Sequence, residues 1–287
     1  MPEGPEVKKI AESLNNHLAS KVITEIFKTN NNPRHNAIEG FNQLVSLLPL
    51  RIGSISSKGK KIIFQLTTLS SPNQMIYLVS SLGTKGSWIF NPTKHADIYF
   101  KVSKLIPISG VSNILLDDVT LYYDDSIHYG VIKLAFNVES FSKIISNIGH
   151  DVLSEGLSKD IWLSVVKNPK LSKKQICWLI MEQKYFSGVG NYIKAESLYR
   201  SKIRPDRLVA DIKDDELELL RTSILAVINE SYQANGLTIK DYKDPEGRLG
   251  NFITQVYGRN TDPYGNLVIK TQFGDKRTSH WVPNIQV

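Results

Sequence analysis

The segment SKKQICWLIMEQKYFSGVGNYIKAESLYRSKI, residues 172–203, decides the fold of the central part of the chain. Apolar residues recur at helical spacing on both sides of SGVGN, residues 187–191, which predicts two helices joined by a turn. Gly188 and Gly190 allow a tight turn, and the N–H groups that open the second helix would then point outward beside the Asn191 amide. That geometry binds phosphate, but glycines also end helices in ordinary helix–helix turns. Taken alone, the segment leaves both interpretations open.

Helical patterns continue on either side of this segment. Residues 159–166 are amphipathic, and residues 214–236 form the longest helical pattern, with acidic residues in the first turn and Gly236 at the end. Residues 5–18 and 138–148 predict two further helices, the first of which begins at Pro5. The sequence from about residue 158 to residue 236 therefore predicts a helical bundle.

Short apolar, β-branched runs separated by turn residues fill most of the region between residues 21 and 136. They are residues 21–27, 50–56, 61–68, 75–81, 96–102, 113–118, 119–123 and 130–136. This spacing predicts a two-sheet sandwich or a flattened barrel. The strand pattern returns near the end of the chain, in residues 252–258, 266–272 and 277–282.

The composition narrows the class of protein. A chain of 287 residues with 41% hydrophobic residues is large enough for two cored domains. The lone Cys177 excludes a disulfide framework and a cysteine-based zinc site within the chain. The absence of a long apolar run or a signal-peptide pattern predicts an intracellular protein without a membrane span. The net charge of +7 favours a polyanionic partner.

The first residues, MPEGPE, place two carboxylates and two prolines ahead of the first helix. Removal of the initiator methionine would leave Pro2 with a secondary α-amine, whose pKa of about 8 leaves a fraction unprotonated at neutral pH. Such an amine can form an iminium with an aldehydic carbon, and Glu3 can transfer a proton beside it. The same residues also suit a simple helix start, because acidic side chains are favourable there. Chemistry alone does not decide between these interpretations.

Two basic turns are candidates for contacts with a phosphate backbone. Residues 56–63, SSKGKKII, contain Lys58, Lys60 and Lys61 around a glycine, and residues 273–276, FGDK, join the last two strand patterns just before Arg277. Basic turns are also common on solvated surfaces.

Taken together and in this order, MPEGPEV, KGKKI, EQKYFSGVGNYIKAESLY and VYGR before a basic hairpin resemble the formamidopyrimidine-DNA glycosylase and endonuclease VIII family of base-excision repair enzymes. The resemblance spans essentially the whole chain. It is strongest to the endonuclease VIII-like branch with a zincless finger, because many relatives hold the terminal hairpin with four cysteines and this chain has none there. Packing of Tyr257, Leu267, Ile269 and Trp281 is then expected to hold the hairpin.

The resemblance implies an α+β fold of three domains. These are an N-terminal catalytic two-sheet β-sandwich with flanking helices (residues 1–150), a helix–two-turn–helix DNA-binding domain (residues 151–249) and a C-terminal antiparallel β-hairpin (residues 250–287). It also implies a monomer without cofactor that acts on double-stranded DNA with oxidised bases or abasic sites. That no metal is needed is expected from the cysteine count and not from the resemblance. The expected compartment is one that contains DNA, either a nucleus or a viral replication site.

The resemblance also implies a mechanism. Pro2 would attack C1′ of a nucleotide flipped out of the duplex, Glu3 would protonate the sugar ring oxygen, and Glu6 would position Glu3 or the substrate. β,δ-Elimination would follow from the resulting iminium. Lys60, Asn191 and Arg277 match the family residues that grip phosphates around the flipped nucleotide. A non-catalytic DNA-binding module and an amine enzyme acting on small aldehydes are the alternatives.

Three positions correspond to the side chains that fill the gap left by the flipped base. Thr84, Ile127 and Tyr129 stand there, without the arginine that relatives use to contact the orphaned base. The loop of residues 237–252, with Tyr242, matches the one that covers the lesion in relatives. The endonuclease VIII-like resemblance implies oxidised pyrimidines as the main substrates, and hydantoins as a second class.

Without that arginine, we expect weak discrimination by the opposite base, since no side chain is left to read its hydrogen-bonding edge. Excision from duplexes that differ only at the opposite base should vary by less than about tenfold. Single-turnover rates against all four bases test this, and a larger spread would require another residue that reads the base.

Overall fold

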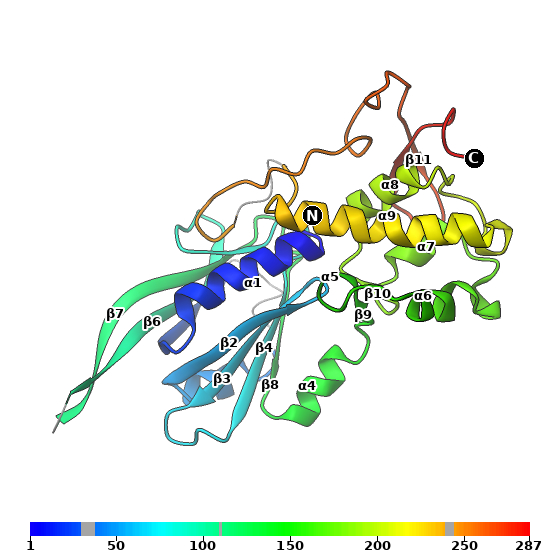
Figure 1. Ribbon diagram of the computed structural model, residues 1–287. Helices are drawn as coiled ribbons and strands as arrows, with labels where there is room; N and C mark the ends of the chain where they lie inside the picture. The colour runs from blue at the N-terminus through cyan, green and yellow to red at the C-terminus, as the bar shows by residue number, and fades with distance from the viewer. Residues whose placement is uncertain (30–37, 109–110, 239–243) are drawn as a thin grey trace. The chain divides into compact units, whose positions relative to one another are not determined.

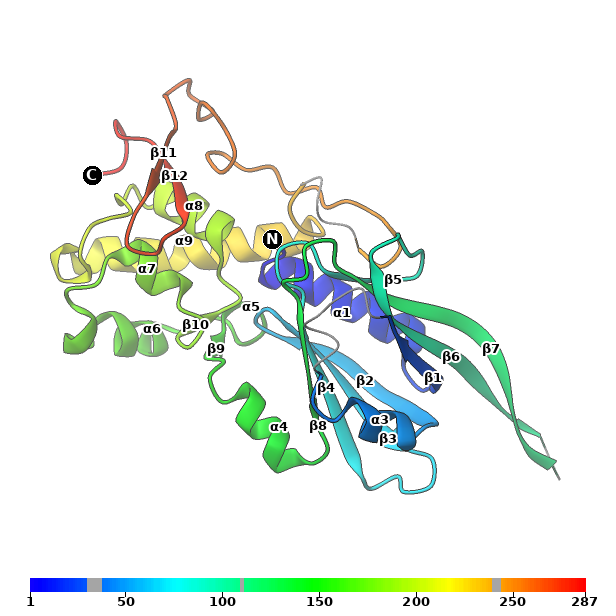
Figure 2. The same cartoon turned by 180° about the vertical axis from the view of Figure 1, so that it is seen from behind.

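The computed structural model describes residues 1–29, 38–108, 111–238 and 244–287, excluding the side chains of residues 106–118. The chain packs as two compact units. Unit 1 contains residues 1–2, 6–146 and 239–249, and unit 2 contains residues 3–5, 147–238 and 250–287. The predicted α+β class is confirmed, with a β-sandwich, a helical region and a terminal hairpin (Figures 1 and 2). The three-domain boundaries at residues 150 and 249 remain a prediction.

Unit 1 holds most of the strands. Its helices are α1 (Gly4–Leu18), apart from the first two residues of that helix, α3 (Phe41–Ser46) and α4 (Val138–Ile145). Its strands are β1 (Val22–Lys28), β2 (Leu50–Lys58), β3 (Lys61–Thr68), β4 (Met75–Ser81), β5 (Ser87–Ile89), β6 (Ala96–Ile108), β7 (Val111–Asp124) and β8 (Val131–Ala135). The two runs expected at 113–118 and 119–123 form the single strand β7, because its antiparallel pairing with β6 continues across both.

The eight strands form one hydrogen-bonded sheet in the order β5-β7-β6-β1-β2-β3-β4-β8. Among the residues that the structure describes, its two halves are joined only where β1 pairs with β2, at Val22 with Arg51 and Ile23 with Leu50. In contrast, β2 and β3 pair along almost their whole lengths. A junction of two residue pairs lets the sheet fold over, so the halves face each other as a sandwich.

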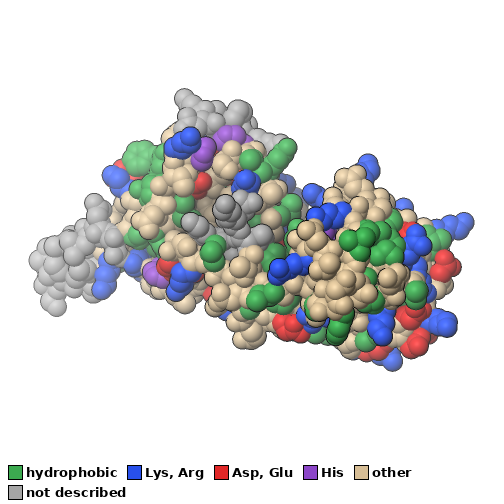
Figure 3. All heavy atoms as spheres, turned by 90° about the horizontal axis from the view of Figure 1, so that it is seen from above, with side chains coloured by type: hydrophobic (Ala, Val, Ile, Leu, Met, Phe, Trp, Pro, Cys, Tyr) green, Lys and Arg blue, Asp and Glu red, His purple; other side chains and the backbone are tan. Residues whose placement is uncertain are grey.

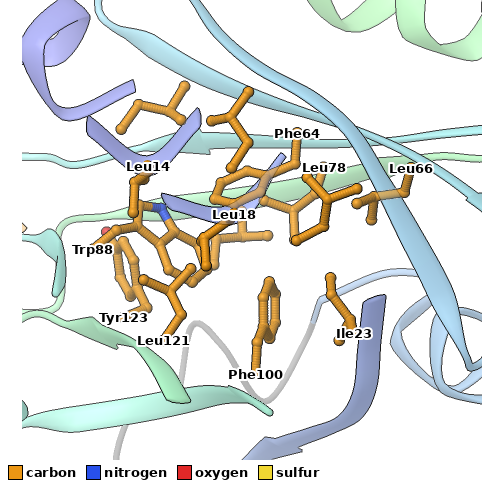
Figure 4. Packing of buried hydrophobic residues seen from close by; sticks show 14 of the residues in the cluster. Leu14, Leu18, Ile23, Phe64, Leu66, Leu78, Trp88, Phe100, Leu121 and Tyr123 are labelled. Carbon is orange, nitrogen blue, oxygen red and sulfur yellow. The ribbon is translucent and has the colours of Figure 1, made fainter. Parts of the chain in front are cut away.

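Large aromatic side chains from both halves meet in the core of unit 1 (Figure 4). The ring centroid of Phe64 in β3 lies 5.1 Å from that of Trp88 in β5, which lies 5.2 Å from Phe100 in β6. Leu14 and Leu18 of α1, both fully buried, pack into the same cluster. The apolar stripe of the first helix thus completes the sandwich core, as its helical spacing predicts.

The described part of unit 2 contains seven α-helical or 3₁₀ segments of the central region and the terminal hairpin. The helices are α5 (Val152–Glu155), α6 (Lys159–Val166), α7 (Ile176–Met181), α8 (Asn191–Arg200) and α9 (Asp214–Gln233), with 3₁₀ turns at Pro169–Leu171 and Val209–Asp211. The strands are β9 (His150–Asp151), β10 (Phe186–Ser187), β11 (Ile269–Gln272) and β12 (Thr278–Trp281). Helix α7 is shorter than expected, because Gln175 pairs with Leu208 in an extended bridge just before it.

The strand expected at residues 252–258 does not form. The carboxylate of Glu196, fully buried in α8, accepts hydrogen bonds from the N–H groups of Gln255 (2.8 Å), Val256 (2.9 Å) and Tyr257 (2.8 Å). Three consecutive N–H groups converging on one carboxylate require a turn, since successive groups in a strand point in opposite directions. An apolar sequence pattern could not reveal that a carboxylate distant in the sequence binds these N–H groups.

The terminal segment also has its own small core. Val256, Val268 and Val282 pack on Ala195 and Tyr199 of α8, with Tyr257 beside them. Trp281 is buried as expected, but the expectation for Leu267 is wrong, since 66% of its surface is exposed. The valines occupy the buried positions instead.

Basic and acidic side chains are spread over the face seen in Figure 3. Within the described ranges, none of the helices combines the length and the hydropathy needed to cross a lipid bilayer. Within the same ranges, no group of three or more His, Cys, Asp or Glu side chains could hold a metal ion.

We predict that Glu196→Ala destabilises the protein by about 3 kcal/mol, because it leaves one buried and two partly buried N–H groups without their acceptor. Urea unfolding measures this loss. Glu230→Ala, which removes a half-exposed partner of Arg200, is the matched control and should cost less than about 1 kcal/mol. Equal losses in the two variants would contradict the role assigned to Glu196.

Candidate active site and nucleic-acid interface

The SGVGN turn is fixed by Gln183. Its side-chain Nε2 donates to the carbonyls of Met181 (2.8 Å) and Val189 (2.7 Å), while its Oε1 accepts from Gly188 N–H (3.1 Å). Gly188 has a φ of 95°, a conformation that favours glycine. The carbonyl of Gly188 in turn accepts the N–H of Gly4 at 2.9 Å. The turn therefore holds the start of the chain through its backbone.

Glu3 occupies the N-terminus of α8. Its carboxylate accepts the N–H groups of Tyr192 (2.9 Å) and Ile193 (3.3 Å), and 3% of the residue's surface is exposed. A carboxylate is favourable there because the helix dipole and the unpaired N–H groups both stabilise negative charge. The expectation that these N–H groups point outward to phosphate is thus wrong for Tyr192 and Ile193, since Glu3 binds them.

Gly190 makes this contact possible. A Cβ at this position would lie 2.3 Å from the carboxyl carbon of Glu3, closer than any real contact of that kind. The second glycine of SGVGN is therefore required by the close approach of a side chain. Sequence reasoning had assigned it to turn flexibility.

Asn191, the first residue of α8, faces the terminal hairpin. Its Nδ2 donates to the carbonyl of Thr278 at 3.0 Å, while its Oδ1 is buried and has no hydrogen-bond partner among the described residues. Burial, and then the charge of Glu3, raise the pKa of Tyr257, while Asn191 and Arg277 act in the opposite direction. Unit 2 thus brings together Glu3, Asn191 and Arg277 around Tyr257.

Sequence reasoning missed Tyr257 as a site residue and placed it only in the packing of the hairpin. Its position in the quoted VYGR motif, directly before Gly258, was the available signal. Arg277 itself is exposed, and its backbone N–H donates to Asp275 Oδ1 at 3.1 Å.

Pro2, Glu6 and Lys60 lie in unit 1. Pro2 is buried, and Glu6 is fully buried in the first turn of α1. Lys60 is half-buried in the turn between β2 and β3, next to Gly59, which has a φ of 54°. A tight glycine turn that carries lysines is therefore confirmed, while the role of Lys60 remains a prediction.

The expected gap-filling residues lie on two adjoining turns of unit 1. A Cβ on Gly83, next to Thr84, would lie 2.7 Å from the backbone carbon of Tyr129, so the turns are in direct contact. Asp125, fully buried, holds the second turn by accepting the N–H groups of Ile127 (3.2 Å) and Gly130 (2.6 Å). Tyr129 is 57% exposed, as a side chain that inserts into DNA would need to be.

Tyr242 lies outside the described residues. The residues that follow it are held on unit 1, where Glu246 accepts a hydrogen bond from Ser13 Oγ at 2.6 Å and lies 3.3 Å from His17 Nδ1. Phe90 N–H donates to the carbonyl of Pro245 at 3.3 Å.

Comparison with known proteins identifies the family of the chain. The formamidopyrimidine-DNA glycosylase N-terminal domain matches residues 1–128, and the H2TH domain of formamidopyrimidine-DNA glycosylase matches residues 148–243. Curated proteins named formamidopyrimidine-DNA glycosylase are similar throughout. The one from Cytobacillus firmus is 26% identical over 100% of both chains, and the one from Rickettsia felis is 28% identical over 97% of this chain and 96% of its own.

Solved structures show the same fold. The Lactococcus lactis enzyme, in a complex with DNA containing an oxidised pyrimidine, has a TM-score of 0.81 at 22% identity, with 99% of each chain covered. The Thermus thermophilus MutM structure also has a TM-score of 0.81 at 22% identity, covering 99% of this chain and 98% of that one.

The two matched domains, which together cover most of the chain, define a DNA glycosylase of base-excision repair. The chain belongs to the formamidopyrimidine-DNA glycosylase family. These relatives carry the formamidopyrimidine-DNA glycosylase name, so the closer tie to the endonuclease VIII-like branch remains a prediction. As a repair enzyme the protein acts inside the cell, where its DNA is.

We predict that Gly190→Ala lowers base excision by about 10²-fold, because the new methyl group must displace the Glu3 carboxylate. Single-turnover kinetics on lesion-containing duplex measure the loss, with circular dichroism to confirm the fold. Gly53→Ala is the matched control, since its nearest neighbour would be the Gln65 carbonyl at 3.4 Å, an ordinary contact. Equal rates in the two variants would refute the steric argument.

Proposed function

We propose that this enzyme is a bifunctional DNA glycosylase and abasic-site lyase that removes oxidised bases through an N-terminal proline Schiff base. The observation that carries the proposal is the fixed position of Glu3, held by two N–H groups of α8 immediately after Pro2. A general acid must be fixed next to the nucleophile it assists, and adjacency in the chain guarantees that distance.

The proposed reaction begins when the Pro2 nitrogen lone pair attacks C1′ of the flipped nucleotide. Glu3 donates a proton to the ring oxygen, which leaves C1′ with the electrons of the C1′–O4′ bond as the sugar ring opens. The C1′–base bond also breaks, and the base leaves with the bonding electrons and takes up a proton. The nitrogen loses its own proton and the product is a C1′ iminium, which needs no proton to stay cationic. Loss of a C2′ proton then expels the 3′ phosphate, and loss of a C4′ proton expels the 5′ phosphate.

The proposed partner is double-stranded DNA that contains oxidised bases or abasic sites, bound by the protein as a monomer. The Lactococcus lactis relative has been crystallised with DNA containing an oxidised pyrimidine and with abasic-site DNA, which supports this class of ligand. Arg277 and Lys60 would contact phosphates, and the unpartnered Asn191 Oδ1 would face a donor in the complex. Residues that grip the backbone suit an enzyme that must scan any sequence.

Borohydride reduction tests the Schiff base. The enzyme with a free Pro2 should form a covalent adduct with lesion-containing duplex, because hydride adds to the iminium carbon and makes the link permanent. The same chain with an uncleaved N-terminal extension has no free Pro2 amine and should still bind DNA without forming an adduct. An adduct from the extended chain would mean that another amine is the nucleophile.

Glu3→Gln separates the two activities. We expect loss of base excision, because the ring oxygen is no longer protonated, but continued trapping on a pre-formed abasic site, which already offers an open-chain aldehyde.

A panel of duplexes with different lesions tests the substrate class, with oxidised pyrimidines expected to be excised fastest and hydantoins next. Faster excision of formamidopyrimidine purines would overturn the pyrimidine preference and leave the Schiff base untouched.

A further inference from the structure

The tip of the terminal hairpin, residues 273–277, rests on a buried ion pair. Lys194 Nζ of α8 lies 2.5 Å from Asp275 Oδ2, and the side chains are 0% and 2% exposed. Lys194 also donates to Ser279 Oγ at 2.9 Å. Removing two charges from water is costly, and such a pair often contributes less stability than apolar residues of the same shape. The contribution of this ion pair therefore lies in the backbone geometry that it imposes on the hairpin tip.

Asp275 connects this pair to Arg277. While its Oδ2 binds Lys194, its Oδ1 accepts the backbone N–H of Arg277 at 3.1 Å. The tip is closed on its other side by Gly274 N–H, which donates to Gln175 Oε1 at 2.7 Å, and within the turn Lys276 N–H donates to the Phe273 carbonyl at 3.0 Å. The backbone from which the exposed Arg277 side chain projects is thus fixed from inside.

One face of α8 is involved in both candidate phosphate contacts of unit 2, those of Asn191 and Arg277. Asn191 in its first turn binds the Thr278 carbonyl, and Lys194, three residues later, binds Asp275 and Ser279. Residues three apart on a helix lie on one face. Lys194 cannot touch DNA itself, because none of its side chain is exposed.

We propose that Lys194 and Asp275 are positioning residues that hold Arg277 in the orientation needed to bind a DNA phosphate. The inference rests on the proposed function, in which Arg277 contacts the backbone of the damaged strand. A positioning role differs from a purely stabilising one in a measurable way. Loss of the pair should remove the phosphate contact made by Arg277, beyond any change in the stability of the fold.

The salt dependence of DNA binding measures the number of phosphate contacts that the protein makes. Arg277→Ala should reduce the slope of log K against log salt by about 1, because one phosphate contact is lost. Lys194→Met should reduce it by the same amount, and the double variant should lose no more than Arg277→Ala alone. Binding is measured with a duplex carrying a stable abasic-site analogue, at temperatures where circular dichroism shows each variant folded.

The reactivity of the Cys177 thiol reports independently on whether the hairpin tip stays in place. This thiol is fully buried beneath the hairpin, and burial, with the charge of Asp275 as a second cause, raises its pKa to about 12. The native enzyme should therefore resist thiol reagents, and Lys194→Met should speed labelling at least tenfold as the tip moves away. Asp275→Asn, which keeps the shape of the side chain, should show both effects if Lys194→Met does not fold.

Lys167→Met is the matched control, because it breaks a surface pair with Asp214 in the same unit. It should change neither the salt slope nor the labelling of Cys177. If Arg277→Ala lowers the slope but Lys194→Met and Asp275→Asn do not, or if the losses add, the pair is merely structural and the inference is wrong. If Arg277→Ala itself leaves the slope unchanged, the phosphate contact in the proposed function fails, and the inference fails with it. A Pro2-dependent borohydride adduct would still support the chemistry in that case.

Discussion

The contact between the Glu3 carboxylate and the N-terminus of α8 is the interaction on which the rest of the site depends. It gives two unpaired N–H groups of the helix an acceptor and fixes the residue that follows the proposed nucleophile. Two neighbouring residues make this contact possible. Gly190 leaves room for the carboxylate, and Gln183 shapes the turn whose carbonyl binds Gly4.

Helix α8 also explains how a terminal hairpin without cysteines stays folded. Eight of its ten residues are buried, among them the charged Lys194 and Glu196. Each polar side chain reaches a different part of the terminal segment, with Glu196 at residues 255–257, Lys194 at the tip, and Tyr199 at Asp262 (2.9 Å). Asp262 in turn accepts the N–H groups of residues 264 and 266. Buried polar side chains of α8 thus hold the terminal segment at three separate places.

Sequence reasoning predicted the elements whose signal is local. The length of α9 followed from its periodicity and acidic first turn, and α1 from its apolar stripe at Leu14 and Leu18. It failed at residues 252–258, where the apolar pattern is typical of a strand. There the carboxylate of Glu196, at least 59 positions earlier in the chain, accepts the N–H groups that a strand would use for pairing. The Pro2–Glu3 pair was predictable because the two residues are adjacent. The partners of Glu3 were not, because they lie 189 and 190 positions further on.

The capping role of Glu3 changes how experiments on this residue must be interpreted. The same oxygens that would transfer a proton also complete the first turn of a buried helix, so chemistry and architecture share one carboxylate. A substitution that removes both oxygens disturbs the helix that presents Asn191 as well as the acid. The inactivity of such a variant is therefore not evidence of acid catalysis, and only a replacement that keeps an acceptor at the helix end can isolate the proton.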